Sequence, residues 1–101
     1  MSYSIKLSPL AKTDVQDIIA YYNENKNGLG TRFFNSLAVT FKLIAKNPLL
    51  FQIRYRNTHS VLIQKFPIQV HYLVDEVNKN VIVIAVSHTS RNPQIWKERG
   101  G

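Results

Sequence analysis

Two histidines, an arginine and a lysine are the side chains of this sequence that suit a reaction at a phosphate. His88 and Arg91 follow a run of β-branched residues at 81–86, and Lys65 and His71 precede that run. Histidine or lysine can take a proton from a hydroxyl, and arginine can stabilise the charge of a phosphorane. This chemistry suits cleavage of RNA through its 2′-hydroxyl, which DNA lacks. A central strand followed by a basic turn without catalysis is the alternative.

Further cations, an amide and an aromatic residue extend this set toward binding of RNA or another target. These candidate binding residues are Arg54, Arg56, Gln69, Trp96, Lys97 and Arg99. In the segment 68–74 the two-residue period of a strand places Gln69, His71 and Leu73 on one face and the other side chains on the opposite face. We expect helices to cover the apolar face, which consists of Ile68, Val70, Tyr72 and Val74. We expect the face of Gln69 and His71 to lie open to RNA, with an ordinary solvated sheet face as the alternative.

Positive charge is concentrated in the middle half of the chain. The sequence has 13 Lys and Arg against 6 Asp and Glu, which gives a formal net charge of +7. Between Asn25 and Val74 there is no acidic residue, but there are these cations: Lys26, Arg32, Lys42, Lys46, Arg54, Arg56 and Lys65. Such asymmetry favours a polyanionic partner, either nucleic acid or an acidic protein segment. A basic surface that serves only solubility is the alternative.

Several function classes lack their signatures in this sequence. Cysteine is absent, and His59, His71 and His88 have no metal-ligand spacing, so we expect no metal site and no cofactor. Paired carboxylates, a glycine-rich phosphate loop and a serine-elbow motif are also absent. No segment is long and apolar enough to span a membrane, and the N-terminus lacks the apolar run of a signal peptide. We therefore expect a cytoplasmic protein.

The first half of the chain predicts one strand and two helices. The 101 residues are expected to form a single domain, 1–101, around one core. Alternation predicts a strand at 3–7, and Ser8 and Pro9 begin a helix that runs to about Asn25. The turn at 25–30 contains two glycines and two asparagines, which supply positive-φ positions. Thr31 is expected to cap a second helix, which Asn47 and Pro48 end.

The second half of the chain predicts strands. Pro67 and a polar turn at 76–80 separate them. We interpret 49–57 as a loop that crosses under the helices, with 54–56 at the start of the next strand. The predicted strands lie at 60–66, 68–74 and 81–86. The order β-α-α-β-β-β predicts an α+β fold in which a two-helix hairpin packs on one face of a mainly antiparallel sheet.

Five short motifs occur in one order along nearly the whole chain. They are Leu7-Ser8-Pro9-Leu10-Ala11, then Ile18-Ile19-Ala20-Tyr21-Tyr22, Ala45-Lys46-Asn47-Pro48, Phe66-Pro67 before Val70-His71-Tyr72, and Val86-Ser87-His88-Thr89-Ser90-Arg91-Asn92-Pro93 with Trp96. Each motif alone is degenerate, but their succession resembles the RelE/ParE superfamily of type II toxin–antitoxin toxins, the plasmid-stabilisation type. The resemblance implies a RelE/ParE-like fold that closes with a short C-terminal helical turn.

The resemblance also implies a toxin that a cognate antitoxin neutralises. The acidic segment of such an antitoxin is disordered when free, and it would fold against the basic surface of the toxin. RelE-like members cleave mRNA on the ribosome, whereas ParE-like members inhibit DNA gyrase and are not enzymes. We favour a ParE-like member or one with an unassigned target; an enzyme of this family would be an mRNA endoribonuclease. An inactive module that keeps only antitoxin binding is a further alternative.

The candidate residues divide between the two activities. Arg91 stands where RelE-like nucleases keep a C-terminal arginine on the phosphate, and His88 and Lys65 are available to carry protons or bind phosphate. Gln69 stands where several of these nucleases carry a catalytic arginine. Trp96 lies near their tyrosine or histidine, and an indole can stack on a base but cannot remove a proton. These two differences favour gyrase as the target.

Overall fold

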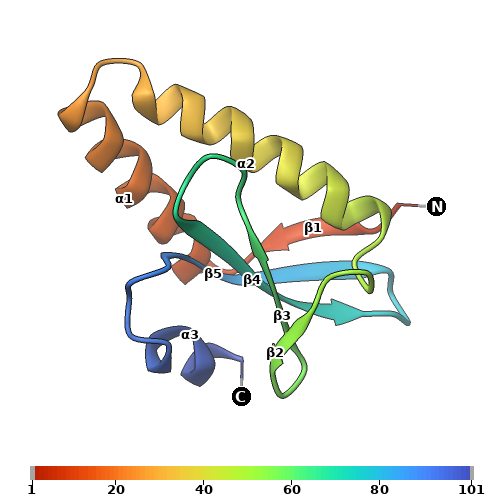
Figure 1. Ribbon diagram of the computed structural model, residues 1–101. Helices are drawn as coiled ribbons and strands as arrows, with labels where there is room; N and C mark the ends of the chain where they lie inside the picture. Colours follow the sequence, from red (N-terminus) through yellow and green to blue (C-terminus); the bar gives the residue numbers. More distant parts are fainter. Residues whose placement is uncertain (1, 101) are drawn as a thin grey trace.

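A helical hairpin lies against one face of a twisted sheet, and a short third helix lies against the other, in a computed structural model that describes residues 2–100 (Figure 1). The elements in chain order are β1 (Ser4–Leu7), α1 (Pro9–Asn25), α2 (Leu29–Lys46), β2 (Ile53–Tyr55), β3 (Thr58–Leu62), β4 (Ile68–Asp75), β5 (Asn80–His88) and α3 (Gln94–Arg99). Across the sheet the strand order is β1-β5-β4-β3-β2, with β1 parallel to β5 and the other neighbours antiparallel. The predicted α+β fold is confirmed, with one strand more than expected.

Local sequence signals explain where the two long helices begin and end. The Ser8 hydroxyl accepts a hydrogen bond from the Ala11 amide at 3.1 Å, and Pro9 occupies the first turn of α1 as predicted. The second helix ends at Lys46, directly before Asn47 and Pro48. It begins at Leu29 and not after Thr31, because Gly28 takes the left-handed conformation (φ 86°) and serves as the N-cap.

Gly30 has a different role from the one predicted for it, which was to supply positive φ to the turn. It is buried inside α2, and a Cβ atom there would lie 2.6 Å from the Ile19 carbonyl oxygen of α1. Its amide donates to the Asn23 side-chain oxygen at 2.9 Å. Glycine is therefore needed here so that the two helices can approach each other closely.

The main core fills the space between the helical hairpin and the sheet. Phe33, Leu37 and Ile44 of α2 are almost fully buried against the strands. The face predicted to meet the helices is the one that meets them: its members Ile68, Val70, Tyr72 and Val74 all belong to this core. The Tyr72 hydroxyl donates to the Pro48 carbonyl at 2.6 Å, so it ties β4 to the end of α2.

The predicted strand at 60–66 is wrong at both ends. The observed β3 is Thr58–Leu62, and the residues after it turn back toward β4. Its partner β2 (Ile53–Tyr55) overlaps the stretch 54–56 that was expected to start the next strand, but it is a separate strand, with Ile53 opposite His59 and an irregular register. The first two residues of β3, Thr58 and His59, are buried although both are polar. They break the apolar alternation, so the pattern did not indicate that two separate strands pair here.

The face of Gln69 and His71 is not open as predicted, because α3 covers it. Trp96 of α3 is only 8% exposed, and its ring stacks on the His71 imidazole with centroids 4.0 Å apart and planes 10° apart. Ile84 and Ala85 join Trp96 in a second, smaller core on this face. A six-residue helix has too little apolar periodicity to be predicted as a cover for a sheet.

The Tyr72→Phe substitution tests the link between β4 and α2. It leaves the buried Pro48 carbonyl without its donor, so we expect the free energy of unfolding to fall by about 1–3 kcal/mol. Urea denaturation followed by circular dichroism measures the change. Tyr21→Phe is the control, because Tyr21 is 62% exposed and its change should stay within about 0.5 kcal/mol. Equal effects of the two substitutions would contradict this role of Tyr72.

Candidate functional site

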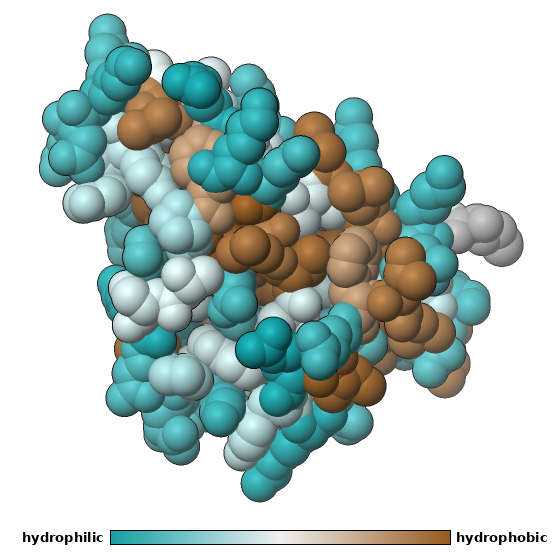
Figure 2. Space-filling view, in the orientation of Figure 1, coloured by the Kyte–Doolittle hydropathy of each residue, from teal (hydrophilic) through white to brown (hydrophobic). Residues whose placement is uncertain are grey.

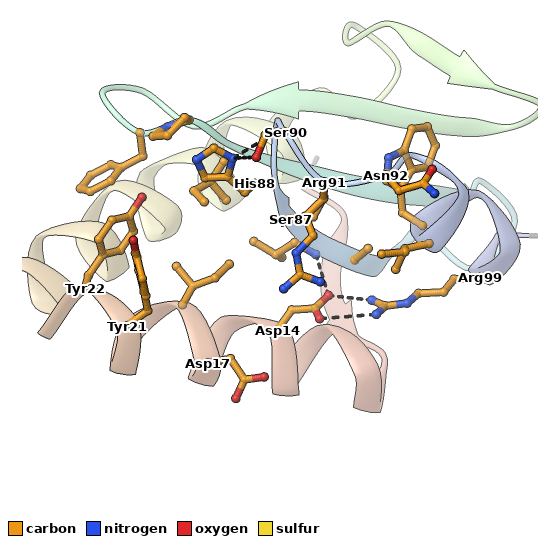
Figure 3. Close-up of a pocket in the computed structure, with 18 of the residues that line it drawn as sticks. Asp14, Asp17, Tyr21, Tyr22, Ser87, His88, Ser90, Arg91, Asn92 and Arg99 are labelled. Atoms are coloured by element: carbon orange, nitrogen blue, oxygen red, sulfur yellow. Dashed lines mark hydrogen bonds and ion pairs between the residues drawn. The ribbon is translucent and has the colours of Figure 1, made fainter. Parts of the chain in front are cut away.

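A groove of about 860 Å³ opens between α1 and the C-terminal end of β5 (Figure 3). It follows from the length of β1, which pairs with β5 only from Asn80 to Val83. The rest of β5 has no strand on that side, so α1, α3 and the turn at 65–67 form the walls. We call this the β5 groove. Its polar and aromatic lining includes Asp14, Tyr21, Tyr22, Lys65, His88, Arg91 and Arg99.

A β-bulge marks the point where β5 leaves β1. The β4–β5 register places Tyr72 opposite Val83 and His71 opposite Ala85, so Ile84 has no partner on β4. Ile84 and Ala85 therefore both belong to the core under α3, although they are consecutive. Val86 returns to the main core on the hairpin side. Because the bulge interrupts regular pairing, the backbone groups near it need other partners.

Asp14 and Arg99 supply those partners. The Asp14 carboxylate accepts a hydrogen bond from the Val86 amide at 3.0 Å and forms an ion pair with Arg99 at 2.6 Å. The same Arg99 nitrogen donates to the Ile84 carbonyl at 3.0 Å, and the Ser8 hydroxyl reaches that carbonyl at 3.5 Å. Both charged side chains are about one-fifth exposed, at 21% and 19%. This pair therefore joins α1, β5 and α3 at the floor of the groove (Figure 3).

His71 lies beneath the groove wall as a fully buried, neutral side chain. Its Nδ1 is 2.6 Å from the Ser60 hydroxyl, and its Nε2 is 3.2 Å from the Ser87 hydroxyl. Burial is the main cause that lowers its pKa to about 4, and the nearby positive charges of Arg54 and Arg99 contribute to the same shift. In the neutral ring one nitrogen donates and the other accepts, so the two serines satisfy both.

Three of the four predicted catalytic residues come together. Lys65, His88 and Arg91 all line the β5 groove, whereas His71 does not. The His88 Nδ1 accepts a hydrogen bond from the Ser90 amide at 3.0 Å, and the Ser90 hydroxyl lies 2.7 Å from it. Figure 3 shows the Arg91 side chain reaching from the loop after β5 into the groove. A histidine, a lysine and an arginine are therefore available on one exposed surface.

Four of the six predicted binding residues lie in two places. Trp96 and Arg99 line the β5 groove, and both also hold α3 in position. Around Tyr55, the Arg56 guanidinium lies 5.4 Å and the Lys97 ammonium 4.8 Å from the ring centroid. The other two are Gln69, which is half-buried on β4, and Arg54, which is exposed on β2.

Sequence reasoning missed the α1 side of the groove. Tyr21 and Tyr22 appeared only as part of a family motif, and Asp14 was not among the predicted site residues. The exposure of Tyr21 could have been predicted, since its neighbours Ile18, Ile19 and Tyr22 complete the apolar face of the helix without it.

Within residues 2–100 no cluster of three His, Asp or Glu side chains offers a metal site. No helix in this range is long and apolar enough to cross a membrane.

Comparison with known proteins identifies related sequences and structures. The family described as "ParE toxin of type II toxin-antitoxin system, parDE" matches residues 5–93. No curated protein matches the chain significantly.

Solved toxin structures share the fold. A chain of the chromosomal ParDE system from P. aeruginosa superposes with a TM-score of 0.74 at 11% identity, over 86% of this chain and 96% of that one. A mutant E. coli toxin RelE in the free state superposes with a TM-score of 0.74 at 14% identity, and the match covers 99% of this chain and 96% of RelE. A chain of the intact E. coli RelBE toxin–antitoxin complex superposes with a TM-score of 0.65 at 16% identity, over 89% of this chain and 100% of that one. At these identities the structures show a common fold and nothing about the target.

The Asp14→Ala substitution tests the junction at the floor of the β5 groove. It removes the partner of the Val86 amide and of Arg99, so we expect α3 to loosen and the free energy of unfolding to fall by about 1–3 kcal/mol. Trp96, the single tryptophan, reports on α3 through its fluorescence, which should shift to longer wavelength. Asp17→Ala is the control, because Asp17 is an exposed carboxylate on the same helix. An unshifted Trp96 spectrum for Asp14→Ala would contradict this role.

The buried His71 makes stability depend on pH. Its pKa is about 4 in the folded protein against 6.5 ordinarily, so between these values the unfolded chain binds the extra proton. The neutral, buried imidazole contributes fully to the free energy of unfolding above about pH 6.5. As the pH falls from about 7 to about 5, the free energy of unfolding decreases by about 2 kcal/mol. Urea denaturation at both pH values should show a smaller drop for His71→Gln, whereas the exposed His88→Gln should keep the drop. An equal drop in the free energy of unfolding for the wild type and His71→Gln would contradict this.

Proposed function

Because the chain belongs to the ParE toxin family of type II toxin–antitoxin systems, we propose that it stops growth by binding DNA gyrase in the cytoplasm and that a cognate antitoxin neutralises it. The observation that supports this target over mRNA is the state of His71. Its imidazole is buried beneath Trp96 and its pKa is about 4, so it is neither accessible to RNA nor a useful base near pH 7. Gln69, on the same strand, replaces the arginine of several RelE-like nucleases.

The β5 groove suits recognition of another protein. Tyr21 stands 62% exposed on α1, and Tyr22 and Arg91 line the same groove. Tyrosine and arginine are enriched among the residues that dominate binding energy at protein interfaces, because they bury large surfaces and still form hydrogen bonds. An inhibitor that acts by binding needs such a surface and needs no aligned acid and base. The groove therefore supports a target that is bound and not cleaved.

The charge distribution supports an antitoxin as the second partner. The formal charge of +7 comes from the middle half of the chain, where no acidic residue lies between Asn25 and Val74. An acidic protein segment would be attracted to this surface and could fold on it. The P. aeruginosa structure that shares the fold comes from a ParDE toxin–antitoxin system, and the E. coli structure is a RelBE toxin–antitoxin complex.

A ribosome-dependent mRNA endonuclease is the second candidate function. The observation that favours it is the grouping of Lys65, His88 and Arg91 along one groove. His88 is exposed and could exchange a proton with a 2′-hydroxyl, and Arg91 could stabilise the phosphorane. In this case the reaction would use the end of β5 and would leave His71 as a structural residue.

Controlled expression in a bacterial host distinguishes the two functions. We expect growth to stop, mRNA to stay intact, and gyrase to be trapped on broken DNA with altered plasmid supercoiling. We expect co-expression of the neighbouring small gene for the antitoxin to restore growth. Primer extension on abundant mRNAs and recovery of gyrase–DNA adducts measure the two activities in one culture.

The Arg91→Ala variant makes the comparison decisive. For a gyrase inhibitor, any loss of toxicity in this variant should parallel a loss of gyrase binding, with mRNA intact throughout. Lys12→Ala is the matched control, because Lys12 is an exposed cation on α1 outside the β5 groove, and it should remain toxic. Ribosome-dependent mRNA cuts that Arg91→Ala abolishes would replace the gyrase proposal with the nuclease.

A further inference from the structure

The turn between α1 and α2 contains a dipeptide that can modify itself. Asn27 and Gly28 lie between the end of α1 at Asn25 and the start of α2 at Leu29, and both are exposed. The turn is at the far end of the helical hairpin, away from the strands (Figure 1). Figure 2 shows mainly hydrophilic surface at this end of the molecule, so water reaches the turn. Asparagine is a chemically labile residue, because a main-chain nitrogen can attack its side-chain carbonyl.

One hydrogen bond closes this turn, and it spans the peptide bond between Asn27 and Gly28. The Leu29 amide donates to the Lys26 carbonyl at 3.0 Å, so Asn27 and Gly28 are the two central residues of the turn. Gly28 has a φ of 86°, which glycine adopts at little cost. Among the hydrogen bonds of residues 2–100, none engages the Asn27 side chain or the Gly28 amide. The attacking nitrogen and the carbonyl that it would attack are therefore both available.

The other asparagines lack this combination of features. Asn27 is the one asparagine in the sequence that glycine follows. The Asn23 side chain accepts a hydrogen bond from the Gly30 amide, and the Asn25 side chain donates to the Tyr21 carbonyl, both at 2.9 Å. The remaining asparagines precede proline, which has no N–H, or a residue whose side chain hinders the attack: Asn35, Asn47, Asn57, Asn78, Asn80 and Asn92.

We propose that Asn27 is a site of self-modification, at which the folded protein converts this asparagine into isoaspartate and aspartate. The Gly28 amide nitrogen loses its proton to base in solution and bonds to the side-chain carbonyl carbon of Asn27. The bond from that carbon to the side-chain nitrogen breaks, and this nitrogen takes up a proton and leaves as ammonia. Water then opens the cyclic imide. Opening at the main-chain carbonyl gives isoaspartate, whose backbone runs through Cβ, and opening at the side-chain carbonyl gives aspartate.

The charge around the turn favours the anionic steps of this reaction. Because α2 begins at Leu29, the partial positive charge of its N-terminus lies next to the reacting amide. Lys26 and Arg32 add two exposed cations, whereas the acidic residue closest in the sequence is Glu24 on the last turn of α1. A positive potential stabilises both the deprotonated nitrogen and the oxyanion that forms when it attacks.

The isoaspartate product would disrupt the turn and the aspartate product would not. The longer main chain of isoaspartate separates the Lys26 carbonyl from the Leu29 amide, so their hydrogen bond is lost. The helices tolerate little change of spacing nearby, since even a Cβ atom on Gly30 would lie 2.6 Å from the Ile19 carbonyl oxygen. Leu29 also lines the β5 groove, so the change reaches the edge of that surface. Aspartate keeps the normal main chain, and its carboxylate is favourable beside the N-terminus of α2.

Ageing of the complete purified protein tests the proposal. Folded protein and urea-unfolded protein are kept in the same mildly alkaline buffer, and peptide mass spectrometry follows each asparagine. A protein isoaspartate methyltransferase with a labelled methyl donor measures the isoaspartate formed. In the folded protein we expect Asn27 to react about tenfold or more faster than Asn25 and Asn35, which are exposed but lie in helices. A folded chain that keeps Asn27 intact while the unfolded chain reacts would overturn the proposal.

Two substitutions separate the reaction from its change of charge. Asn27→Gln should stay unmodified, because its longer side chain forms the cyclic imide far more slowly, and Asn27→Asp carries the charge of the product on a normal main chain. The urea midpoint of the wild type should fall on ageing, while aged Asn27→Gln should match its fresh sample and fresh Asn27→Asp should match the fresh wild type or exceed it. An unchanged midpoint after Asn27 has reacted would overturn the effect on the hairpin. An equal fall in Asn27→Gln would assign the ageing to another site and would overturn it as well.

Discussion

The ion pair between Asp14 and Arg99 is the interaction on which the arrangement of this protein depends. Where β1 ends, β5 continues with a bulge at Ile84 and has no strand on one side. Exposed strand edges attract other chains, and unsatisfied backbone groups are costly when they are buried. Asp14 accepts from the Val86 amide and Arg99 donates to the Ile84 carbonyl, so two side chains replace the missing strand. The same contact fixes α3 over the sheet.

This junction also explains how the chain accommodates a buried polar cluster. With α3 in place, Trp96 stacks on His71, and the serines 60 and 87 satisfy both imidazole nitrogens. A buried histidine is tolerated when both nitrogens have partners and the ring stays neutral. Lys65, Arg91 and Tyr21 lie outside this closed centre, in the lining of the β5 groove. The buried cluster therefore contributes to the stability of the fold, and exposed polar and aromatic side chains line the groove beside it.

The sequence predicted the features that local rules determine, and missed those that depend on distant contacts. Ser8 and Pro9 began α1, and Asn47 and Pro48 ended α2, because capping and proline geometry act within a few residues. The division of this region into two paired strands, β2 and β3, escaped prediction because Thr58 and His59 break the alternation. The partners of Asp14 lie 72 and 85 residues away, so no local pattern could identify them. The grouping of Lys65, His88 and Arg91 followed from the order of the strands.

The short β1 leaves room for the β5 groove. It pairs with β5 only as far as Val83, so the rest of β5 lacks a neighbouring strand on that side, and α1 and α3 lie beside it as walls. A longer β1 would pair with the Val86 amide and the Ile84 carbonyl, which Asp14 and Arg99 bind instead, and it would occupy the space of the groove. The end of β1 and the two side chains that take its place are therefore one feature, and that feature accounts both for the position of α3 and for the surface along which Lys65, His88 and Arg91 lie.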